Sequence, residues 1–226
     1  MRRLDRQIAI SDIHGCAKTF HELLFDVVDL QLTDTLYLLG DYINKGPDSK
    51  GVIDQIFSLE NRGYEVYCLR GNHEQYLLDA LTNPEKEFDF LSRGGVETLQ
   101  SFQVGYTGDL PKNYIEFFEN LGYYIELENY MLVHAGFDFE NEDLFVDEDA
   151  MLNIRAMRVD RDLIGGRNII HGHVPLPVTE IEKSLDFKNH HISIDAGCVY
   201  QHIHALNHLV ALDIQTRNLY IQKNID

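Results

Sequence analysis

The first half of the chain alternates short apolar runs with segments whose apolar residues recur at helical spacing. The apolar runs, which predict buried strands, are QIAIS, TLYLLG and EVYCLR. The segments between them predict helices over about residues 18–30 and 49–61. This β-α-β-α-β order predicts a parallel sheet covered by helices.

The second half begins with further helical patterns and then changes to closely spaced strands. Helices are expected over residues 73–81, 85–93, 96–102 and 115–121, and strands at YYIEL, YMLVHA, NIIHG, HISIDAG, HLVALDI and NLYIQ. Turns such as ENY and IQTRN are short enough for antiparallel hairpins. We therefore expect an α/β fold, a sandwich of two mixed β-sheets flanked by helices, in one domain over residues 1–226.

Charge changes the picture more than the rest of the composition does. The chain has 19 Lys and Arg against 37 Asp and Glu, a net charge of −18. Such a surface repels phosphate backbones and anionic lipid headgroups, so we expect neither duplex nucleic acid nor a membrane as a partner. A phosphorylated substrate remains possible because bound divalent cations reverse the local field.

The termini and cysteines indicate a cytoplasmic protein. Two arginines open the chain without an apolar run of signal-peptide length after them, and no later segment approaches membrane-spanning length. Cys16, Cys68 and Cys198 are odd in number and form no CxxC pair. They predict buried free thiols, without disulfides or a structural zinc site.

The predicted strands end beside glycines in residues that can bind metals or transfer protons. The stretches are SDIHG, GDYINKG, RGNHE, VHAG, IHGHV and IDAG. Because ligands of open α/β sheets gather at the carboxyl ends of the strands, these stretches are expected to form one site. Each has an ordinary explanation when taken alone, such as Asn72 as a helix N-cap, but their conjunction favours a site.

These strand ends supply the ligands for two divalent cations. Asp12 and His14 point the same way from an extended segment and can share one cation, which Asp41 could bridge to a second. Asn72, His134 and His173 would complete the second site. This oxygen and nitrogen set suits Mn²⁺, Fe or Zn²⁺ better than Ca²⁺.

The same motifs, in this order from Asp12 to Asp195, resemble those of the calcineurin-like metallophosphoesterases. The chain is most similar to the small bacterial and phage phosphoprotein phosphatases, which include lambda-type Ser/Thr protein phosphatases and symmetrical diadenosine tetraphosphatases. In many other metallophosphoesterases a second metal-binding histidine follows the equivalent of His173, whereas this chain has Pro175. His171 is therefore expected to be only a neighbour of the site.

The resemblance implies a mechanism and assigns roles. One metal would lie on Asp12, His14 and Asp41, the other on Asp41, Asn72, His134 and His173, with a hydroxide between them attacking phosphorus. The family's general acid corresponds to His73, and its phosphate-binding arginine in MLNIRAMR to Arg155. The expected substrate contacts are Lys45, Asn72 and Arg155. Mn²⁺ is the expected metal pair, with Fe or Zn²⁺ as alternatives.

The chain departs from the family in GDYINKG, where relatives usually read GDxVDRG. Asn44 replaces the aspartate that pairs with the catalytic histidine, and Lys45 replaces an arginine. Asn44 is expected to accept a hydrogen bond from His73 without stabilising its cationic form, and Lys45 loses the bidentate fork. These changes predict lower turnover or a shifted pH optimum.

Three further segments have an ordinary explanation that we favour. RGGVETLQSF, residues 93–102, resembles a helix-opening segment of small bacterial relatives and is expected to serve packing. His202, His204 and His208 stand where small relatives often have glycines, and they are expected to lie on a polar strand face or loop, with an extra metal or substrate contact as the alternative. The acidic run over residues 138–150 could rim the site but is expected to be solvated.

Three functions compete. The leading hypothesis is a protein serine/threonine phosphatase, and the alternative is a hydrolase of diadenosine polyphosphates or other nucleotides. The third is a catalytically weak phospho-binding protein, suggested by Asn44 and Lys45. An adenine pocket with aromatic walls would favour the nucleotide, whereas an open groove would favour a phosphopeptide.

Restoring the family residues tests the effect of the GDYINKG departure. The double variant Asn44→Asp with Lys45→Arg should have a higher kcat on p-nitrophenyl phosphate with Mn²⁺, because the carboxylate stabilises a cationic His73 and the guanidinium grips two oxygens. An unchanged or lower kcat would show that the site is built for a different pairing or substrate.

Overall fold

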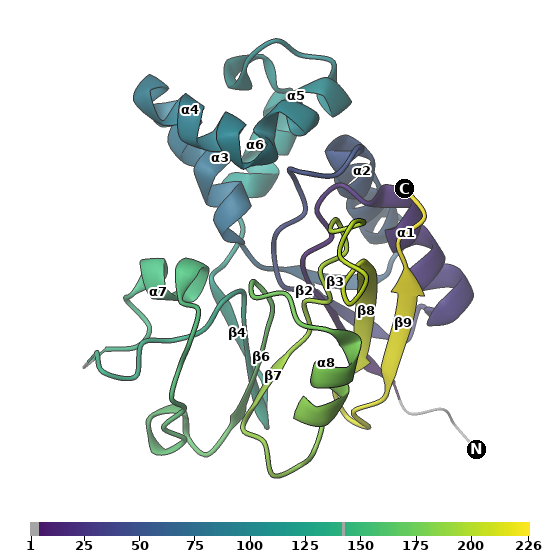
Figure 1. Ribbon diagram of the computed structural model, residues 1–226, viewed down its shortest axis with the longest axis vertical. Helices are drawn as coiled ribbons and strands as arrows, with labels where there is room; N and C mark the ends of the chain where they lie inside the picture. Colours follow the sequence, from purple (N-terminus) through teal and green to yellow (C-terminus); the bar gives the residue numbers. More distant parts are fainter. Residues whose placement is uncertain (1–4, 142) are drawn as a thin grey trace.

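Two β-sheets packed face to face form the centre of the fold (Figure 1). The structure, a computed structural model, describes residues 5–141 and 143–226. The first sheet contains, in spatial order, β3 (Glu65–Cys68), β2 (Thr35–Leu38), β1 (Gln7–Ile10), β8 (His208–Asp213) and β9 (Leu219–Lys223). The second contains β4 (Tyr124–Glu126), β5 (Tyr130–Val133), β6 (Asn168–His171) and β7 (His191–Ser193).

Both sheets mix parallel and antiparallel strands, as the sequence predicts. Strands β1, β2 and β3 are parallel, and β8 and β9 extend the sheet as an antiparallel hairpin. Strands β4 and β5 form the other predicted hairpin. Strands β5, β6 and β7 are parallel, which the closely spaced strand pattern did not indicate, because the chain crosses over between them through helices that the pattern missed.

Alternation along the strands divides the core into layers. In β1, Ile8 and Ile10 face the helices of the first sheet, whereas Ala9 faces the second sheet. In β5, Leu132 faces the space between the sheets and Met131 the opposite side. This period of two places apolar residues on both faces of each sheet, so the strand ends are held rigidly on both sides.

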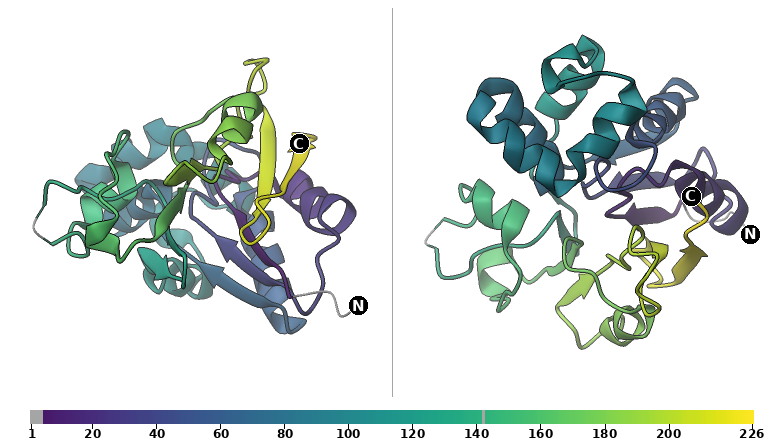
Figure 2. Two further views of the ribbon diagram at one scale, coloured as in Figure 1. Left: turned by 90° about the horizontal axis from the view of Figure 1, so that it is seen from below. Right: turned by 45° about the horizontal axis from the view of Figure 1, so that its top comes forward.

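Helices cover both outer faces. They are α1 (Ala17–Glu22), α2 (Ser49–Asn61), α3 (Asn72–Thr82), α4 (Glu87–Phe90), α5 (Val96–Phe102), α6 (Lys112–Glu119), α7 (Glu148–Asn153) and α8 (Val178–Ser184). Single turns of 3₁₀-helix lie at Pro84–Lys86, Thr107–Asp109 and Asp162–Ile164. Helices α3 to α6 form a group of their own above the strand ends (Figure 2).

Two predicted helices are interrupted, and two helices were not predicted. The helix expected over residues 18–30 is α1 followed by a π-helical turn at Leu23–Val27, and that over residues 85–93 runs from 3₁₀-helix through α4 into a second π-helical turn at Leu91–Gly95. Helices α7 and α8 have six and seven residues, too few for an apolar periodicity to be recognised.

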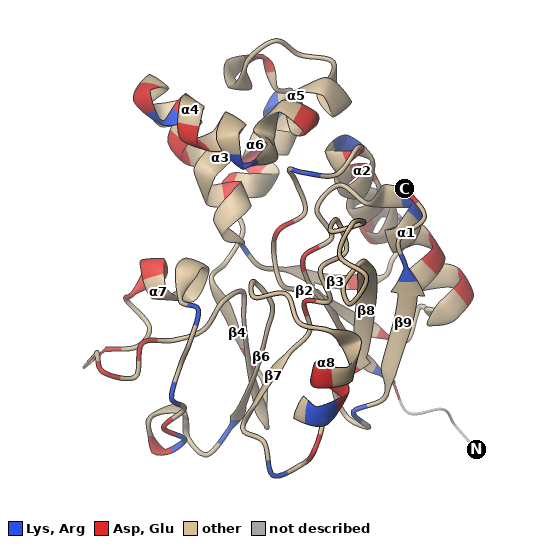
Figure 3. Cartoon of the chain, in the orientation of Figure 1, with Lys and Arg blue, Asp and Glu red and all other residues tan. Residues whose placement is uncertain are grey.

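The excess of acidic residues is spread over the surface helices and loops (Figure 3). Acidic side chains occur on α1, α3, α4, α7 and α8. None of the helices within residues 5–141 and 143–226 has the length and apolar character needed to cross a membrane.

A buried ion pair joins the starts of β1 and β2. The guanidinium of Arg6 donates to both carboxylate oxygens of Asp34, at 3.1 and 2.5 Å, and the two residues are 7% and 2% exposed. Burial alone would raise the pKa of Asp34, but hydrogen bonds from Arg6 and Gln31 outweigh it and lower that pKa. The pair therefore stabilises the fold at neutral pH and loses this effect in acid, as Asp34 takes up a proton.

Asp34→Ala should lower the free energy of unfolding by about 3–5 kcal/mol, because it leaves the Arg6 charge buried without its partner. Urea unfolding at pH 7 measures the loss. Glu180→Ala is the matched control, since it breaks the exposed pair with Lys183 (2.6 Å) and should cost at most about 1 kcal/mol. Equal losses in the two variants would contradict a structural role for the buried pair.

Candidate metal centre and active site

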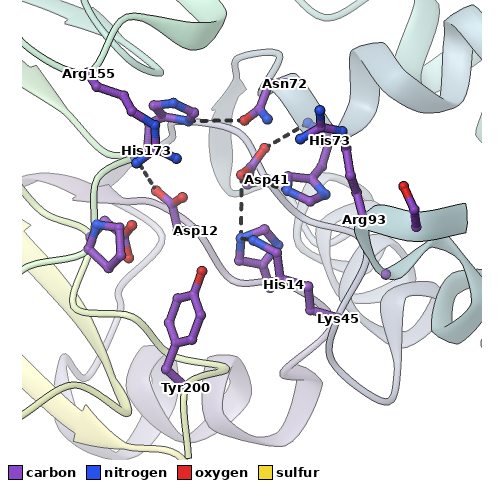
Figure 4. A pocket seen from close by; sticks show the side chains of 14 residues that line it. Asp12, His14, Asp41, Lys45, Asn72, His73, Arg93, Arg155, His173 and Tyr200 are labelled. Carbon is purple, nitrogen blue, oxygen red and sulfur yellow. Dashed lines mark hydrogen bonds and ion pairs between the residues drawn. The ribbon is translucent and has the colours of Figure 1, made fainter. Parts of the chain in front are cut away.

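The predicted site residues lie together at the carboxyl ends of the strands (Figure 4). They surround a pocket of about 370 Å³. Its lining is contributed by the loops after β1, β2, β6 and β7, together with the start of α3, the turn before α5 and the segment after α7. The predicted residues that line it are Asp12, His14, Asp41, Lys45, Asn72, His73, Arg155 and His173, and His134 lies fully buried beside Asp41.

The backbone of these loops is strained. Six site residues that are not glycine adopt positive φ, between 48° and 72°: Asp12, His14, Asp41, Asn44, Lys45 and His173. Each such conformation costs of the order of 1–3 kcal/mol and persists only where the surroundings enforce it. Hydrogen bonds between the loops do so here, with the amide of His14 donating to Asp41 O at 2.8 Å and that of Gly15 to Tyr42 O at 2.8 Å.

A close backbone approach joins the β6 loop to Asp12. The amide of His173 donates to Asp12 Oδ2 at 3.0 Å, and Ser11 Oγ donates to the same oxygen at 2.6 Å. A Cβ added at Gly172 would lie 2.1 Å from that carboxylate oxygen, so only glycine permits this contact. Asp12 and His173 are thereby held in a fixed relation to each other.

Asp41 is the centre of the cluster. Its Oδ2 lies 3.4 Å from His14 Nε2, and its Oδ1 lies 3.6 Å from His134 Nε2. The potential ligand atoms of Asp41, His134 and His173 lie within 4.8 Å of one another, as do those of Asp41, His14 and His73. Asp41 therefore belongs to both groups, but the group with His14 contains His73, the expected general acid, where Asp12 was expected.

The two histidines on either side of Asp41 have the tautomer that metal binding requires. His14 Nδ1 hydrogen-bonds to Ile43 O at 3.0 Å, and His134 Nδ1 to Leu39 O at 2.8 Å. Each Nδ1 therefore carries the proton, which leaves the Nε2 lone pair directed at the cluster. Burial, followed by the charge of Lys45, lowers the pKa of His14 to about 3, so this imidazole is neutral at pH 7.

Asn72 completes one side of the cluster. Its Oδ1 lies 3.1 Å from both His134 Nε2 and His173 Nδ1, so three potential metal-ligand atoms converge. Burial, the largest cause, lowers the pKa of His173 to about 4. Neutral imidazoles, an amide oxygen and carboxylates together fit Mn²⁺, Fe or Zn²⁺.

The carboxylates of the site also fit bound cations. Burial and the adjacent Asp12 raise the pKa of Asp41, because two buried like charges repel. Burial and Asp12 likewise raise the pKa of Asp195, which lines the pocket. Divalent cations would relieve this repulsion.

His73 lies beside the cluster and is held by Asn44. Its Nε2 is 4.0 Å from Asp41 Oδ2, and its Nδ1 is 2.9 Å from Asn44 Nδ2. Thr98 Oγ1 donates to Asn44 Oδ1 at 2.7 Å, so the amide presents its NH₂ group to His73. The expectation that Asn44 accepts a hydrogen bond from His73 is therefore wrong, because the amide nitrogen, which can only donate, is the atom that faces His73 Nδ1.

The direction of this hydrogen bond sets the tautomer of His73. An Nδ1 that accepts from Asn44 carries no proton, so the proton is on Nε2, the nitrogen that faces Asp41. Burial, the largest cause, together with the charge of Lys45 lowers the pKa of His73 well below its ordinary value. His73 is thus a neutral imidazole with an Nε2–H donor.

Cationic side chains line the pocket despite the acidic character of the chain. Lys45 Nζ lies 3.0 Å from His14 Nε2, and Arg155 reaches the rim beside His173 (Figure 4). Arg93, which was expected to serve packing, lines the same pocket. These charges provide for an anionic substrate.

Sequence reasoning missed residues that hold the site together. Glu74 is fully buried, and its carboxylate accepts hydrogen bonds from the amides of Asp41, Tyr42, Ile43 and Gly71. Thr98 and Ser49 both accept from the amide of Asn44, at 2.9 and 3.1 Å. The adjacency of Glu74 to RGNH was the available signal, whereas nothing in the sequence pairs Thr98 with Asn44.

The other residues considered from the sequence lie outside the pocket. His171 is buried and stacks on His191, with ring centroids 5.7 Å apart. His202 and His204 are exposed, and His208 begins β8. Of the described residues in the acidic run over residues 138–150, none lines the pocket, and Asp147 caps α7.

Cys16 and Cys198 are buried free thiols as expected, and Cys68 is partly buried.

Comparisons with known proteins agree with this geometry. The model of the calcineurin-like phosphoesterase family matches residues 6–207. An asymmetrical bis(5'-nucleosyl)-tetraphosphatase of Oceanobacillus iheyensis is 26% identical over 220 residues, which cover 84% of this chain and 83% of that protein. A symmetrical bis(5'-nucleosyl)-tetraphosphatase of Acidovorax sp. is 41% identical over 71 residues, 31% of this chain and 24% of that protein.

The fold is similar to that of a serine/threonine protein phosphatase of Saccharomyces cerevisiae, with a TM-score of 0.65 at 14% identity, over 98% of this chain and 81% of that one. Several curated relatives, including the Acidovorax protein, are matched over only 23–24% of their length. Because the family model matches most of the chain and the two-sheet fold agrees with it, the chain belongs to the calcineurin-like phosphoesterases, a family of metal-dependent phosphoester hydrolases.

Proposed function

We propose that the protein hydrolyses nucleoside polyphosphates of the diadenosine tetraphosphate class at a dinuclear metal centre. The observation that carries the proposal is the cluster around Asp41, in which neutral imidazoles converge on a shared carboxylate at the floor of a cation-lined pocket. Bound there, two divalent cations would polarise the phosphoryl oxygens and lower the pKa of the attacking water. One would be held by Asp12, His14 and Asp41, the other by Asp41, Asn72, His134 and His173.

The substrate assignment rests on likeness to nucleotide hydrolases. The Oceanobacillus protein, which matches most of this chain, is a bis(5'-nucleosyl)-tetraphosphatase by name. The pocket also has an aromatic wall, the ring of Tyr200, with Lys45 Nζ 5.8 Å from its centre. Such a wall suits a nucleobase better than it suits an extended peptide.

A protein serine/threonine phosphatase is the second candidate. Its support is the similarity in fold to the yeast phosphatase, and the same metals and general acid would serve both reactions. A phosphoserine substrate needs one phosphate subsite and an open approach for the flanking peptide. The two functions therefore differ in what the pocket must recognise beyond the scissile phosphate.

The remaining site residues would divide the work of binding and proton transfer. His73 would act as the general acid, giving its Nε2 proton to the departing oxygen. Asn44 would orient the ring by donating to Nδ1 and leave it neutral, and a neutral imidazole is a weaker acid than the cation. Arg155 and Lys45 would bind phosphoryl oxygens, and Asn72 would also contact the substrate.

A substrate panel with Mn²⁺-loaded protein tests the proposed function. Diadenosine tetraphosphate should have a higher kcat/KM than phosphoserine and phosphothreonine peptides, with p-nitrophenyl phosphate as a generic ester. The reverse order would establish the protein phosphatase. Bound metal without turnover of any of these substrates would support the phospho-binding protein instead.

His73→Asn should reduce kcat on good substrates at least about 100-fold, since it removes the proton donor. The bound metal, measured by elemental analysis of the dialysed protein, should stay at the wild-type level. His171→Asn is the matched control, because His171 is also a buried histidine but lies outside the pocket. If His73→Asn retains turnover, His73 is not the general acid. If the variant loses turnover and bound metal together, His73 is a ligand instead.

A further inference from the structure

Arg93 is placed at the pocket by a backbone contact with Lys45. The helical path is broken at Arg93 and Gly94, whose φ values are −100° and 92°. The amide of Lys45 donates to Gly94 O at 3.1 Å, and a Cβ added at Gly94 would lie 2.5 Å from that amide nitrogen. This tight contact joins the turn before α5 to the GDYINKG loop and brings Arg93 to the pocket rim.

The side chain of Arg93 is supported but has no acceptor. Its guanidinium lies 4.3 Å from the centre of the Tyr76 ring, and Tyr76 in turn packs edge-on against His73 at 5.7 Å. Among residues 5–141 and 143–226, no hydrogen bond or ion pair to the Arg93 side chain is present, although the chain has 37 acidic residues. Stacking orients a guanidinium while leaving its five N–H donors free.

The position of Arg93 relative to His73 determines which part of a substrate it meets. A general acid lies beside the leaving group, because it protonates the departing oxygen. Arg93 is on the His73 side of the pocket, whereas Arg155 is on the opposite side, next to His173 (Figure 4). Arg93 therefore faces the atoms beyond the scissile bond.

We propose that Arg93 binds the anionic leaving group of a phosphoanhydride and so selects nucleoside polyphosphates over phosphate monoesters. This inference rests on the proposed function and assigns the specificity to one residue. In the reaction, the water oxygen bonds to phosphorus, the bond from phosphorus to the bridging oxygen breaks, and its electron pair stays on the departing phosphate. Arg93 would hydrogen-bond to that phosphate with the planar fork that Lys45 lacks.

Hydrolysis of a phosphoserine releases the serine hydroxyl as the leaving group, which has no second phosphate, so Arg93 would have nothing to bind. The contribution of Arg93 should then appear only with ligands that carry two linked phosphates. Adenosine diphosphate and adenosine monophosphate differ by one linked phosphate and the negative charge that it carries, which makes them suitable probes when a charge control is included.

Binding of these two nucleotides to Mn²⁺-loaded protein, measured by calorimetry after free metal is removed by dialysis, tests the proposal. Wild-type protein should bind the diphosphate about tenfold more tightly than the monophosphate, the usual effect of a charge-assisted hydrogen bond. Arg93→Gln should lose most of this preference while binding the monophosphate as before. Equal binding of both nucleotides by the wild type, or an unchanged preference in the variant, would overturn the proposal.

Arg62→Gln is the matched control. Arg62 is also exposed and stacked on a tyrosine, 5.2 Å from the Tyr64 ring, but it does not line the pocket. The Arg62→Gln substitution changes the net charge by the same amount as Arg93→Gln, and it should leave the binding of both nucleotides at the wild-type level. If it weakens diphosphate binding as much as Arg93→Gln does, the effect comes from overall charge and the proposal fails.

Turnover separates this inference from the proposed function. Arg93→Gln should lower kcat/KM for diadenosine tetraphosphate about tenfold and change that for p-nitrophenyl phosphate less than about twofold. If the wild type hydrolyses both substrates and the variant loses both equally, the proposal for Arg93 fails and the hydrolase stands. If the wild type hydrolyses neither, the proposed function fails, and the two nucleotides still decide what Arg93 binds.

Discussion

The carboxylate of Glu74 holds the loop on which the site depends. Both of its oxygens accept backbone hydrogen bonds, from Asp41 and Tyr42 at 2.8 Å each, from Ile43 at 3.3 Å and from Gly71 at 2.9 Å. One side chain at the start of α3 thus fixes both the loop after β2 and its own helix terminus. Burial, and then the charge of Asp41, raises the pKa of Glu74 to about 7, so its ionised form relies on these four donors.

The same loop explains why strained backbone and buried charge occur together. Asp41, Asn44 and Lys45 all have positive φ, and their side chains point to the group of potential metal ligands, to His73 and to the pocket respectively. A relaxed loop would direct these side chains elsewhere. Clamping by Glu74 and by the β1 loop keeps them converged, and bound cations would offset the repulsion among Asp12, Asp41 and Asp195.

The helical group α3 to α6 is part of the site rather than a cover over it. Helix α3 carries Asn72 and His73, Thr98 of α5 sets the orientation of Asn44, and the turn before α5 brings Arg93 to the pocket. The departure from the family pattern at Asn44 and Lys45 is therefore accompanied by contacts from another element. The pairing of Asn44 with His73 and the guanidinium of Arg93 lie on the same side of the pocket.

The sequence by itself determined the two-sheet α/β fold and most of the polar residues that the structure brings together around Asp41. Strand periodicity and the polar residues at strand ends are local features, and parallel strands necessarily bring their carboxyl ends to one edge. It also indicated both hairpins, because a short turn between two apolar runs leaves few other connections. Helices α7 and α8 are too short for a recognisable apolar periodicity and were not predicted. Because these helices form the crossovers, the parallel pairing of β5, β6 and β7 was not predicted either.

Only the tertiary structure decided how Asn44 pairs with His73 and what residues 93–102 do. Thr98 lies 54 residues from Asn44 in the sequence. An amide group can donate from its nitrogen or accept at its oxygen, so the direction of the hydrogen bond to His73 depends on how Thr98 orients the Asn44 side chain. Arg93 looked like part of a packing segment because its neighbours Gly94 and Gly95 mark only a turn. Its role follows from a contact between distant loops, which no local pattern encodes.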